Sequence, residues 1–372
     1  MKYVDEFRRG DIARGMAAHI RTLVQPGRQY RLMEFCGGHT HAIARYGLTG
    51  LLPDNIRLIH GPGCPVCVLP IGRVDSAIEL ALRPDVILCS YGDTLRVPAS
   101  NKMSLYQARA KGADVRMVYS TKDALQIARD NPHKQVVFFA IGFETTTPPT
   151  ALALLQARQE KLANFSVFCN HVLTPPAMRH LLAAGDAVEL DGFIGPSHVS
   201  TVIGSAPYAA VATEFAKPVV IAGFEPLDVL QSVAMLVEQI NAGRTEVETQ
   251  FSRAVTHEGN QKARERVAQT MTLRDSFEWR GLGQVPHSAL AIHPDFAEFD
   301  AELRFALPYR HVPDHKACEC GAILRGQKQP QDCKVFGIVC TPDNPLGSCM
   351  VSSEGACAAH YHYGRFVQGA TA

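Results

Sequence analysis

A βα unit is encoded by residues 31–47, RLMEFCGGHTHAIARYG, where an apolar run passes through two glycines into a helical pattern. The apolar run predicts a strand, Gly37 and Gly38 allow a sharp turn, and Thr40 is the expected N-cap of a short helix. Cys36 is then expected between the strand end and the helix N-terminus. The helix dipole and free backbone N–H groups there favour a thiolate. This stretch predicts an α/β fold and a reactive thiol at a strand end.

The same alternation of apolar runs and amphipathic segments continues along the first two thirds of the chain. Strands are predicted at residues 31–35, 56–60, 85–89, 115–119, 136–141, 165–168, 192–194 and 218–222. Helices are predicted at residues 73–82, 104–111, 121–129, 149–161 and 227–242. Apolar strands joined by helices are typical of buried parallel sheets. Repeated strand endings, such as VILCSYGD and VVIAGFEP, favour two smaller sheets over one large one.

Three of these strands are followed by a carboxylate, namely Asp93, Glu144 and Glu225. Groups beyond the carboxyl ends of parallel strands line the binding crevice of open α/β sheets. The same residues are also suited to cap the helices that follow, and the sequence does not decide between these two roles.

The composition excludes several classes of protein. The 372 residues carry a formal net charge of +1, which gives no electrostatic reason to expect nucleic acid or an anionic membrane as a partner. No apolar run approaches the ~20 residues of a membrane span, and the charged start lacks a secretory signal pattern. We therefore expect a cytoplasmic protein. Its eleven cysteines then indicate metal or redox chemistry, because the reducing cytosol disfavours structural disulfides.

A second thiol site is predicted in residues 59–72, IHGPGCPVCVLPIG, where Cys64 and Cys67 form a Cys-x-x-Cys pair. Two sulfurs at this spacing can share a metal or close a disulfide. Pro70 and Gly72 follow, which predicts a loop rather than the helix of thioredoxin-like proteins. Half of a zinc site is the main alternative.

A third group contains six cysteines in an irregular tail that is rich in proline and glycine. They are Cys318, Cys320, Cys333, Cys340, Cys349 and Cys357. Four thiolates can hold a [4Fe–4S] cluster or a tetrahedral zinc ion. The spacing fits neither zinc ribbons nor the bacterial ferredoxin run, and it favours iron–sulfur only slightly. Phosphate-loop, dinucleotide-binding and serine-hydrolase motifs are absent from the sequence.

Together, seven motifs closely resemble the HypD family of [NiFe]-hydrogenase maturation factors. They are CGGHTH (36–41), GPGCPVC (61–67), GFETT (142–146), HVS (198–200), GFEPLD (223–228), EWRGLG (278–283) and MVSSEGAC (350–357). The resemblance spans essentially the whole chain. It implies a redox-active scaffold, rather than an ordinary turnover enzyme, on which the Fe(CN)2CO unit of the hydrogenase is assembled. A HypC-type chaperone and a HypE-type cyanide carrier would be its partners.

The resemblance also implies a fold of two Rossmann-like parallel-sheet domains facing a cleft, with a third, mostly helical and irregular domain that holds a [4Fe–4S] cluster. The expected ranges are 30–131 and 132–223 for the α/β domains, with 1–29 and 224–372 forming the third.

The resemblance assigns roles to the cysteines as well. By position, Cys36 matches an iron-binding cysteine that shares the iron with a HypC cysteine, and His39 matches a histidine close to the iron. Cys64 and Cys67 match a redox-active pair that is also described as iron-binding. The cluster ligands would be Cys320, Cys333, Cys340 and Cys357. Cys318 and Cys349 fall outside the family pattern, although the choice between Cys318 and Cys320 stays slightly open.

The carboxylates Asp93, Glu144, Glu225 and Glu354 are candidates for proton handling near the iron. Two other functions remain as alternatives. A thiol–disulfide oxidoreductase would use Cys64 and Cys67 on protein substrates. A zinc-stabilised interaction module would use the tail cysteines structurally.

Overall fold

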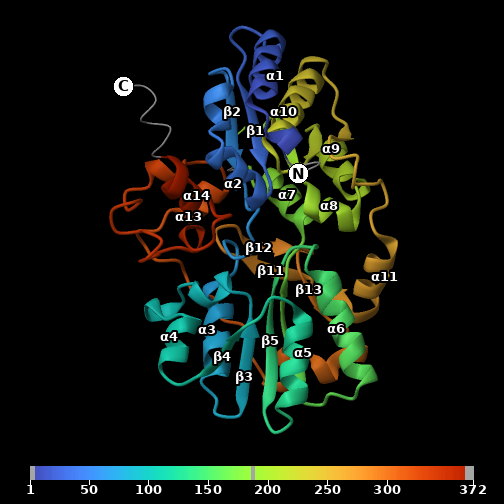
Figure 1. The fold of residues 1–372 in the computed structure, drawn as a ribbon, viewed down its shortest axis with the longest axis vertical. Coiled ribbons are helices and arrows are strands. Elements are labelled where there is room, and N and C mark those ends of the chain that lie inside the picture. The colour runs from blue at the N-terminus through green and yellow to red at the C-terminus, as the bar shows by residue number, and fades with distance from the viewer. Residues whose placement is uncertain (1–4, 186–188, 365–372) are drawn as a thin grey trace.

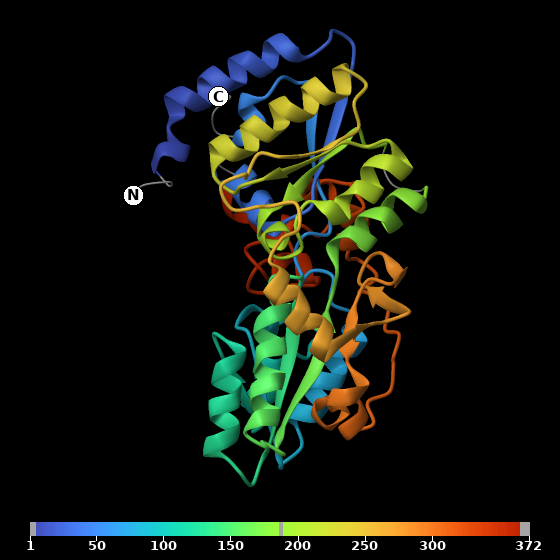
Figure 2. The ribbon, with the colours of Figure 1, turned by 90° about the vertical axis from the view of Figure 1, so that its right-hand side faces the viewer.

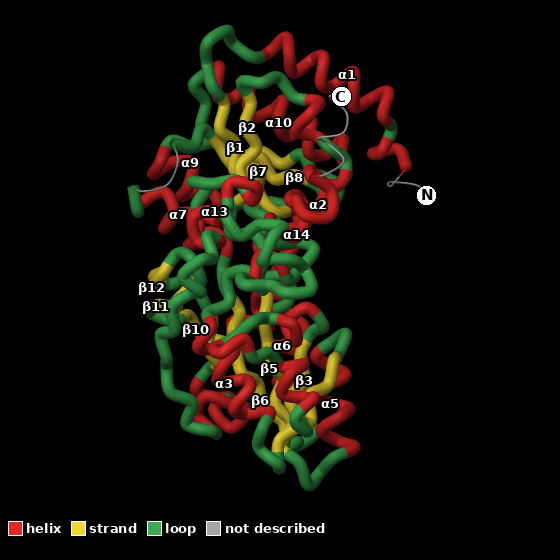
Figure 3. The backbone as a smooth tube through the Cα atoms, turned by 90° about the vertical axis from the view of Figure 1, so that its left-hand side faces the viewer, coloured by secondary structure: helices red, strands yellow, loops and turns green. Residues whose placement is uncertain are grey.

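Two parallel β-sheets frame the molecule, one in the upper half of Figure 1 and one in the lower half. The computed structural model describes residues 5–185 and 189–364. Two small antiparallel strand pairs and the cysteine-rich tail lie between the sheets, in the region where loops predominate in Figure 3. No helix in these described ranges is long and apolar enough to cross a membrane.

Sheet A, the upper sheet, has five parallel strands in the order β2-β1-β7-β8-β9. These are β1 (Tyr30–Glu34), β2 (Ile56–His60), β7 (Gly192–Pro196), β8 (Val219–Ala222) and β9 (Val247–Thr249). The register pairs Glu34 with His60 on one side and with Ile194 on the other. Three strands therefore end close together at one edge.

Sheet B, the lower sheet, has four parallel strands in the order β4-β3-β5-β6. These are β3 (Val86–Ser90), β4 (Asp114–Met117), β5 (Gln135–Gly142) and β6 (Phe165–His171). Every residue of β3 and β6 is buried. Their continuous apolar runs are those expected of strands covered on both faces.

Helices cover both sheets. Around sheet A lie α1 (Gly10–Leu23), α2 (Gly37–Arg45), α7 (Thr174–Ala183), α8 (Ser197–Ile203), α9 (Ala209–Phe215) and α10 (Pro226–Asn241). Around sheet B lie α3 (Ile71–Ala81), α4 (Leu105–Ala110), α5 (Thr121–Asp130), α6 (Thr147–Gln159) and α11 (Gln261–Thr270). Figure 2 shows α1 beside α10 at one end of the molecule, where both bury apolar side chains against sheet A.

The connecting region is built from small elements. It has two antiparallel strand pairs: the hairpin of β11 (Ser276–Trp279) with β12 (Gly283–Pro286), and the flanking pair of β10 (Met271–Leu273) with β13 (Leu290–Ile292). After α12 (Ala301–Arg304), the tail contains α13 (Cys320–Leu324) and α14 (Ala356–Tyr363), joined mostly by turns. Its buried cysteines and apolar residues continue the core of the two sheets.

The expected fold class is confirmed, since the chain has two Rossmann-like parallel sheets and an irregular cysteine-rich region. All eight predicted strands and the five predicted helices are present within a few residues of their expected bounds. The strand pairing differs from the expected division into 30–131 and 132–223. Strands β1 and β2 pair in sheet A with β7 and β8, while β3 to β6 form sheet B.

The residues expected to form a separate third domain also contribute to sheet A. Helices α1 and α10, which belong to the ranges 1–29 and 224–372, pack on each other and on sheet A. Local apolar patterns predict a strand or an amphipathic helix but carry no information on its distant partner. Along the chain, β1 and β2 belong to sheet A, β3 to β6 to sheet B, and β7 to β9 again to sheet A.

Candidate functional site

The carboxyl edge of sheet A, called here the sheet edge, gathers the predicted site residues. Cys36 follows β1, and His60 is the last residue of β2. The loop that carries Cys64 and Cys67 leaves from His60, as the sequence predicts for this pair. Parallel strands bring these segments together because their carboxyl ends share one edge.

Cys36 is the N-cap of α2, with an extended backbone (φ −156°), and its carbonyl accepts from the N–H groups of His39 and Thr40. The expected N-cap, Thr40, is therefore wrong, because the helix begins at Gly37. The Thr40 hydroxyl instead donates to the carboxylate of Glu34. Glu34 also accepts from the backbone N–H of Cys36 at 3.0 Å. This buried carboxylate thus holds the first turn of α2 in position.

The Cys-x-x-Cys loop lies against the backbone of Cys36. Gly37 N–H donates to the Gly63 carbonyl at 3.0 Å. A Cβ atom on Gly63 would lie 2.7 Å from the carbonyl carbon of Cys36, which no side chain tolerates. Glycine at this position allows the two thiol-bearing segments to touch.

The Cys36 side chain is half-buried, and burial raises the pKa of its thiol above its usual range. The neighbouring Glu354 and Glu34 carboxylates also raise it, while N–H groups at the start of α2 act in the opposite direction. The expectation that the helix terminus favours a thiolate therefore does not hold for the protein alone, because burial and two acidic neighbours outweigh the helix terminus.

His39 is fully buried, and its Nε2–H donates to the carbonyls of Ala222 and Gly223 at 3.1 and 3.0 Å. Burial lowers the pKa of the imidazole, so the ring is neutral. Among the described residues its Nδ1 has no hydrogen-bond partner. The ring packs on Phe224, which also stacks on His198. This leaves His39 with one fixed nitrogen and one free lone pair.

A hydrogen-bonded chain that sequence reasoning missed runs from the Cys36 backbone toward a pocket. Glu34 accepts from Nδ1 of His60 at 2.8 Å, and Nε2 of His60 lies 2.9 Å from Nε2 of His360. Burial, with a smaller effect of His60, lowers the pKa of His360 to about 3. In the sequence, only the position of Glu34 at the end of an apolar strand could have indicated this hydrogen-bonded chain, because His360 is 300 residues away from His60.

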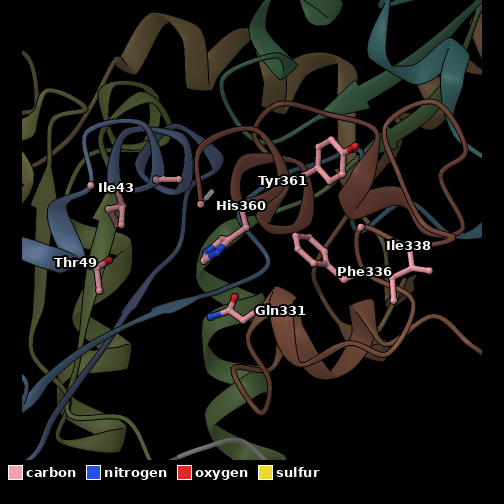
Figure 4. A pocket seen from close by; sticks show the side chains of 11 residues that line it. Ile43, Thr49, Gln331, Phe336, Ile338, His360 and Tyr361 are labelled. Atoms are coloured by element: carbon pink, nitrogen blue, oxygen red, sulfur yellow. The ribbon is translucent and has the colours of Figure 1, made fainter. Parts of the chain in front are cut away.

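The pocket reached by His360 has a volume of about 510 Å³ and lies between α2 and the tail (Figure 4). Figure 4 shows His360 and Gln331 beside the aromatic rings of Phe336 and Tyr361, with Ile43 on the α2 side. None of the predicted site residues lines this pocket. The thiols of Cys36, Cys64 and Cys67 therefore lie outside this pocket.

All eleven cysteines lie in the described part of the chain and are free thiols. Cys64 and Cys67 are 3% and 1% exposed, and the Cys67 N–H donates to the Cys64 sulfur at 3.3 Å. The Ser348 hydroxyl donates to the Cys67 carbonyl at 2.7 Å, which joins this loop to the tail. Burial, together with hydrogen bonds to Cys349 and Cys64, raises the pKa of the Cys67 thiol.

The tail brings most of its cysteines together. Cys349 is hydrogen-bonded to Cys320, Cys357 and Cys67, and these bonds lower the pKa of its thiol. Cys318 is hydrogen-bonded to Cys320.

Two other tail cysteines have different neighbours. Cys340 lies within electrostatic range of Cys320 and Cys318, while Cys333 contacts Glu319. In residues 5–185 and 189–364, no three His, Cys, Asp or Glu side chains are grouped so that they could hold one metal ion. The thiols are close neighbours but do not converge on a single point.

The four candidate carboxylates divide into two kinds. Glu225 is the N-cap of α10, forms a capping box with Asp228 and pairs with Arg8, so its role is structural. Glu144 is buried and accepts from the N–H and hydroxyl of Thr174, and burial raises its pKa to about 7.

Glu354 contacts Gly37, and its Oε2 would lie 2.9 Å from a Cβ placed there. Partial desolvation raises the pKa of Glu354, an exposed residue, and the nearby Asp93 and Glu34 add to the effect. Glu354 and Asp93 therefore lie next to the sheet edge.

Comparisons with known proteins agree with these observations. Residues 11–364 match the family described as "HypD: Hydrogenase formation hypA family". The chain is 64% identical over 371 residues to the hydrogenase maturation factor HypD of Cupriavidus necator, covering 98% of each chain. It is 67% identical over 374 residues to the hydrogenase expression/formation protein HupD of Azotobacter chroococcum, covering 100% of this chain and 99% of the relative. The HypD of Escherichia coli is 47% identical over 368 residues, with 98% of each chain covered.

Proposed function

The chain belongs to the HypD hydrogenase formation family, and from this premise we propose that it is a cytoplasmic scaffold for assembling the Fe(CN)2CO unit of [NiFe]-hydrogenases. The observation that carries the proposal is the contact between Cys36 and the Cys-x-x-Cys loop at the sheet edge. It brings together the segments that carry Cys36, His39, Cys64 and Cys67, and soft thiolates suit iron that carries cyanide and carbon monoxide.

Cys36 is the proposed anchor for the substrate iron. It is half-buried rather than enclosed, so a cysteine of a HypC-type partner can approach the same iron, and a HypE-type carrier can deliver cyanide. The thiol is neutral in the free protein, and loss of its proton would accompany metal binding, as metal–thiolate sites generally require. His39 offers its free Nδ1 as a ligand or hydrogen-bond acceptor beside the iron.

Proton handling falls to Glu354 in this proposal. Its carboxyl lies beside Gly37, and its pKa is raised above the usual range of a glutamate. A protonated carboxyl can donate a hydrogen bond or a proton to groups bound beside Cys36. Asp93 lies near Glu354 and is the next group along this side of the site.

Cys64 and Cys67 are the proposed redox couple. When two thiols close a disulfide they release two electrons and two protons, which matches the need for electrons when diatomic ligands are formed or attached. Their burial supports a role inside this protein. It disfavours a thiol–disulfide oxidoreductase, whose thiols must reach protein substrates.

We assign a [4Fe–4S] cluster to the tail, with Cys320, Cys333, Cys340 and Cys357 as the proposed ligands, whose thiols would draw together around the bound cluster. Gly347 leaves space where a Cβ would lie 2.7 Å from the Cys320 sulfur and even closer to that of Cys318. Arg280 is buried within electrostatic range of both thiols, and its Nη1 has no hydrogen-bond partner among the described residues. A buried arginine that faces several neighbouring thiols and also pairs with Asp314 suits an anionic thiolate cluster. When bound, such a cluster supplies single electrons.

The test of the scaffold role is a Cys36→Ala variant purified anaerobically with a HypC-type partner. We expect loss of the infrared stretches of iron-bound cyanide and carbon monoxide, while the absorption of the tail cluster persists. Cyanide and carbon monoxide stretches at full intensity in the variant would refute the role of Cys36. Metal analysis of the same sample distinguishes iron–sulfur from the zinc alternative.

A further inference from the structure

Cys67 has a second thiol neighbour that neither its motif nor the proposed function uses. Besides Cys64, its sulfur is hydrogen-bonded to that of Cys349 in the distant tail. Cys349 is fully buried and lies in the 3-10 turn η8 (Ser348–Met350). The loop pair and the tail thiols therefore meet at this residue.

Contacts through Ser348 also hold the Cys67 loop against the tail. The Ser348 hydroxyl donates to the carbonyl of Cys67 at 2.7 Å, and the Cys67 thiol lies 4.0 Å from the carbonyl of Ser348. Gly355 permits this turn, since a Cβ there would lie 2.9 Å from the Cys349 carbonyl carbon. The approach of Cys349 to Cys67 is thus supported by contacts of its neighbour Ser348.

Cys349 also faces the tail. Its thiol is hydrogen-bonded to Cys320 and Cys357 as well as to Cys67. A buried cysteine is often only a small apolar residue in a core. Here its sulfur contacts sulfurs on both sides, which ordinary packing does not require.

We propose that Cys349 is a third redox thiol, which exchanges with Cys64 as the disulfide partner of Cys67. The triad Cys64–Cys67–Cys349 thus links the loop to the tail cysteines. The existence of this exchange is independent of the proposed function, and only its use in supplying electrons to the substrate iron rests on that function.

The exchange conserves atoms and electrons. Starting from a Cys64–Cys67 disulfide, the Cys349 sulfur gives up its proton and attacks the sulfur of Cys67. The Cys67–Cys349 bond forms as the Cys64–Cys67 bond breaks, and Cys64 leaves as a thiolate that takes up a proton. No net oxidation occurs, and the disulfide moves from the loop to the tail.

The test is disulfide mapping of the full-length chain, purified anaerobically with its bound metal. In a Cys64→Ser variant, Cys67 loses its motif partner, and diamide should then oxidise Cys67 and Cys349 to a disulfide. We expect Cys67–Cys349 peptides to exceed any other Cys67 pairing at least tenfold after denaturation, alkylation and non-reducing digestion. Metal content is measured before and after oxidation.

Two matched variants sharpen the result. Cys349→Ala should leave the Cys64–Cys67 disulfide intact, and Cys64→Ser combined with Cys349→Ser should leave Cys67 alkylated. A free Cys67 in the Cys64→Ser variant, or its pairing with a different cysteine, overturns the proposal. Because these measurements involve no cyanide, carbon monoxide or partner protein, their outcome is separate from the outcome of the Cys36→Ala test.

Discussion

The sheet edge and the cysteine-rich segment, residues 318–357, both gather sulfurs, but different forces hold them. At the sheet edge, Cys36 lies between a buried strand and a helix, and a buried carboxylate accepts from its N–H. In the cysteine-rich segment, short helices and turns carry the thiols, and their main neighbours are other thiols. Regular strands and helices position the thiols at the sheet edge, whereas contacts among the thiols themselves hold the cysteine-rich segment together.

This difference indicates how each site responds to its metal. Strand pairing and helix packing form the sheet edge before any iron arrives, which suits a place where a cargo is loaded and released. An irregular segment with few ladder hydrogen bonds needs another source of stability, and a metal cluster supplies it. We therefore expect the sheet edge to survive loss of metal and the cysteine-rich segment to open.

Removal of iron is the strongest test of this contrast. Metal binding contributes about 10–16 kcal/mol to the folding of small zinc domains, so loss of the cluster should abolish most of the hydrogen-exchange protection in residues 318–357. Amides of β1, β2 and β5 should stay protected. Mass spectrometry after anaerobic chelation measures both regions in one sample, and equal protection before and after iron loss would contradict the contrast.

The buried carboxyl of Glu144 gives a second test, in a part of the molecule built from regular strands and helices. There the pH dependence of the free energy of unfolding reports on burial alone, without metal. Burial raises the pKa of Glu144, at the end of β5, to about 7 in the folded protein, against an ordinary value of 4.5. Between these values the unfolded chain loses its proton first, so the free energy of unfolding falls as pH rises, by about 3 kcal/mol in total.

Glu144→Gln should remove this pH dependence, because the amide keeps both contacts with Thr174 and never ionises. Urea denaturation from pH 5 to pH 8 measures the slope. Glu265→Gln, on the exposed surface of α11, is the control and should behave like the parent protein. A slope unchanged by Glu144→Gln would place the titrating group elsewhere.

The close approach at the sheet edge gives a smaller effect. Gly63→Ala places a methyl group against the backbone of Cys36 and should destabilise the protein by about 1–3 kcal/mol. Gly15→Ala is the matched control, because a Cβ on this exposed residue of α1 meets nothing within 4 Å. It should be neutral or stabilise the helix by up to ~1 kcal/mol.

Urea midpoints of the two glycine variants give the comparison directly. Equal midpoints would mean that the loop moves away from Cys36 without cost. The sheet edge would then be as deformable as we expect the cysteine-rich segment to be.

Local pattern was sufficient for much of the fold. The apolar run before Cys36 predicted β1, and the proline and glycine after Cys67 predicted a loop. Predictions from local pattern were wrong where a residue makes a contact that the neighbouring sequence does not reveal. Thr40 has the chemistry of an N-cap, but its hydroxyl donates to Glu34. The helix dipole favours a thiolate at Cys36, but burial beside Glu354 outweighs it.

By itself, the sequence determined the α/β class, the strand-end position of Cys36 and the loop position of Cys64 and Cys67, because these depend on residues within one or two turns or strands. Only the tertiary structure decided that β1 pairs with β7, that His360 completes a chain from Glu34, and that Cys349 lies beside Cys67. Each of these joins residues more than 150 positions apart, and no periodicity along the chain records which distant surfaces bury one another.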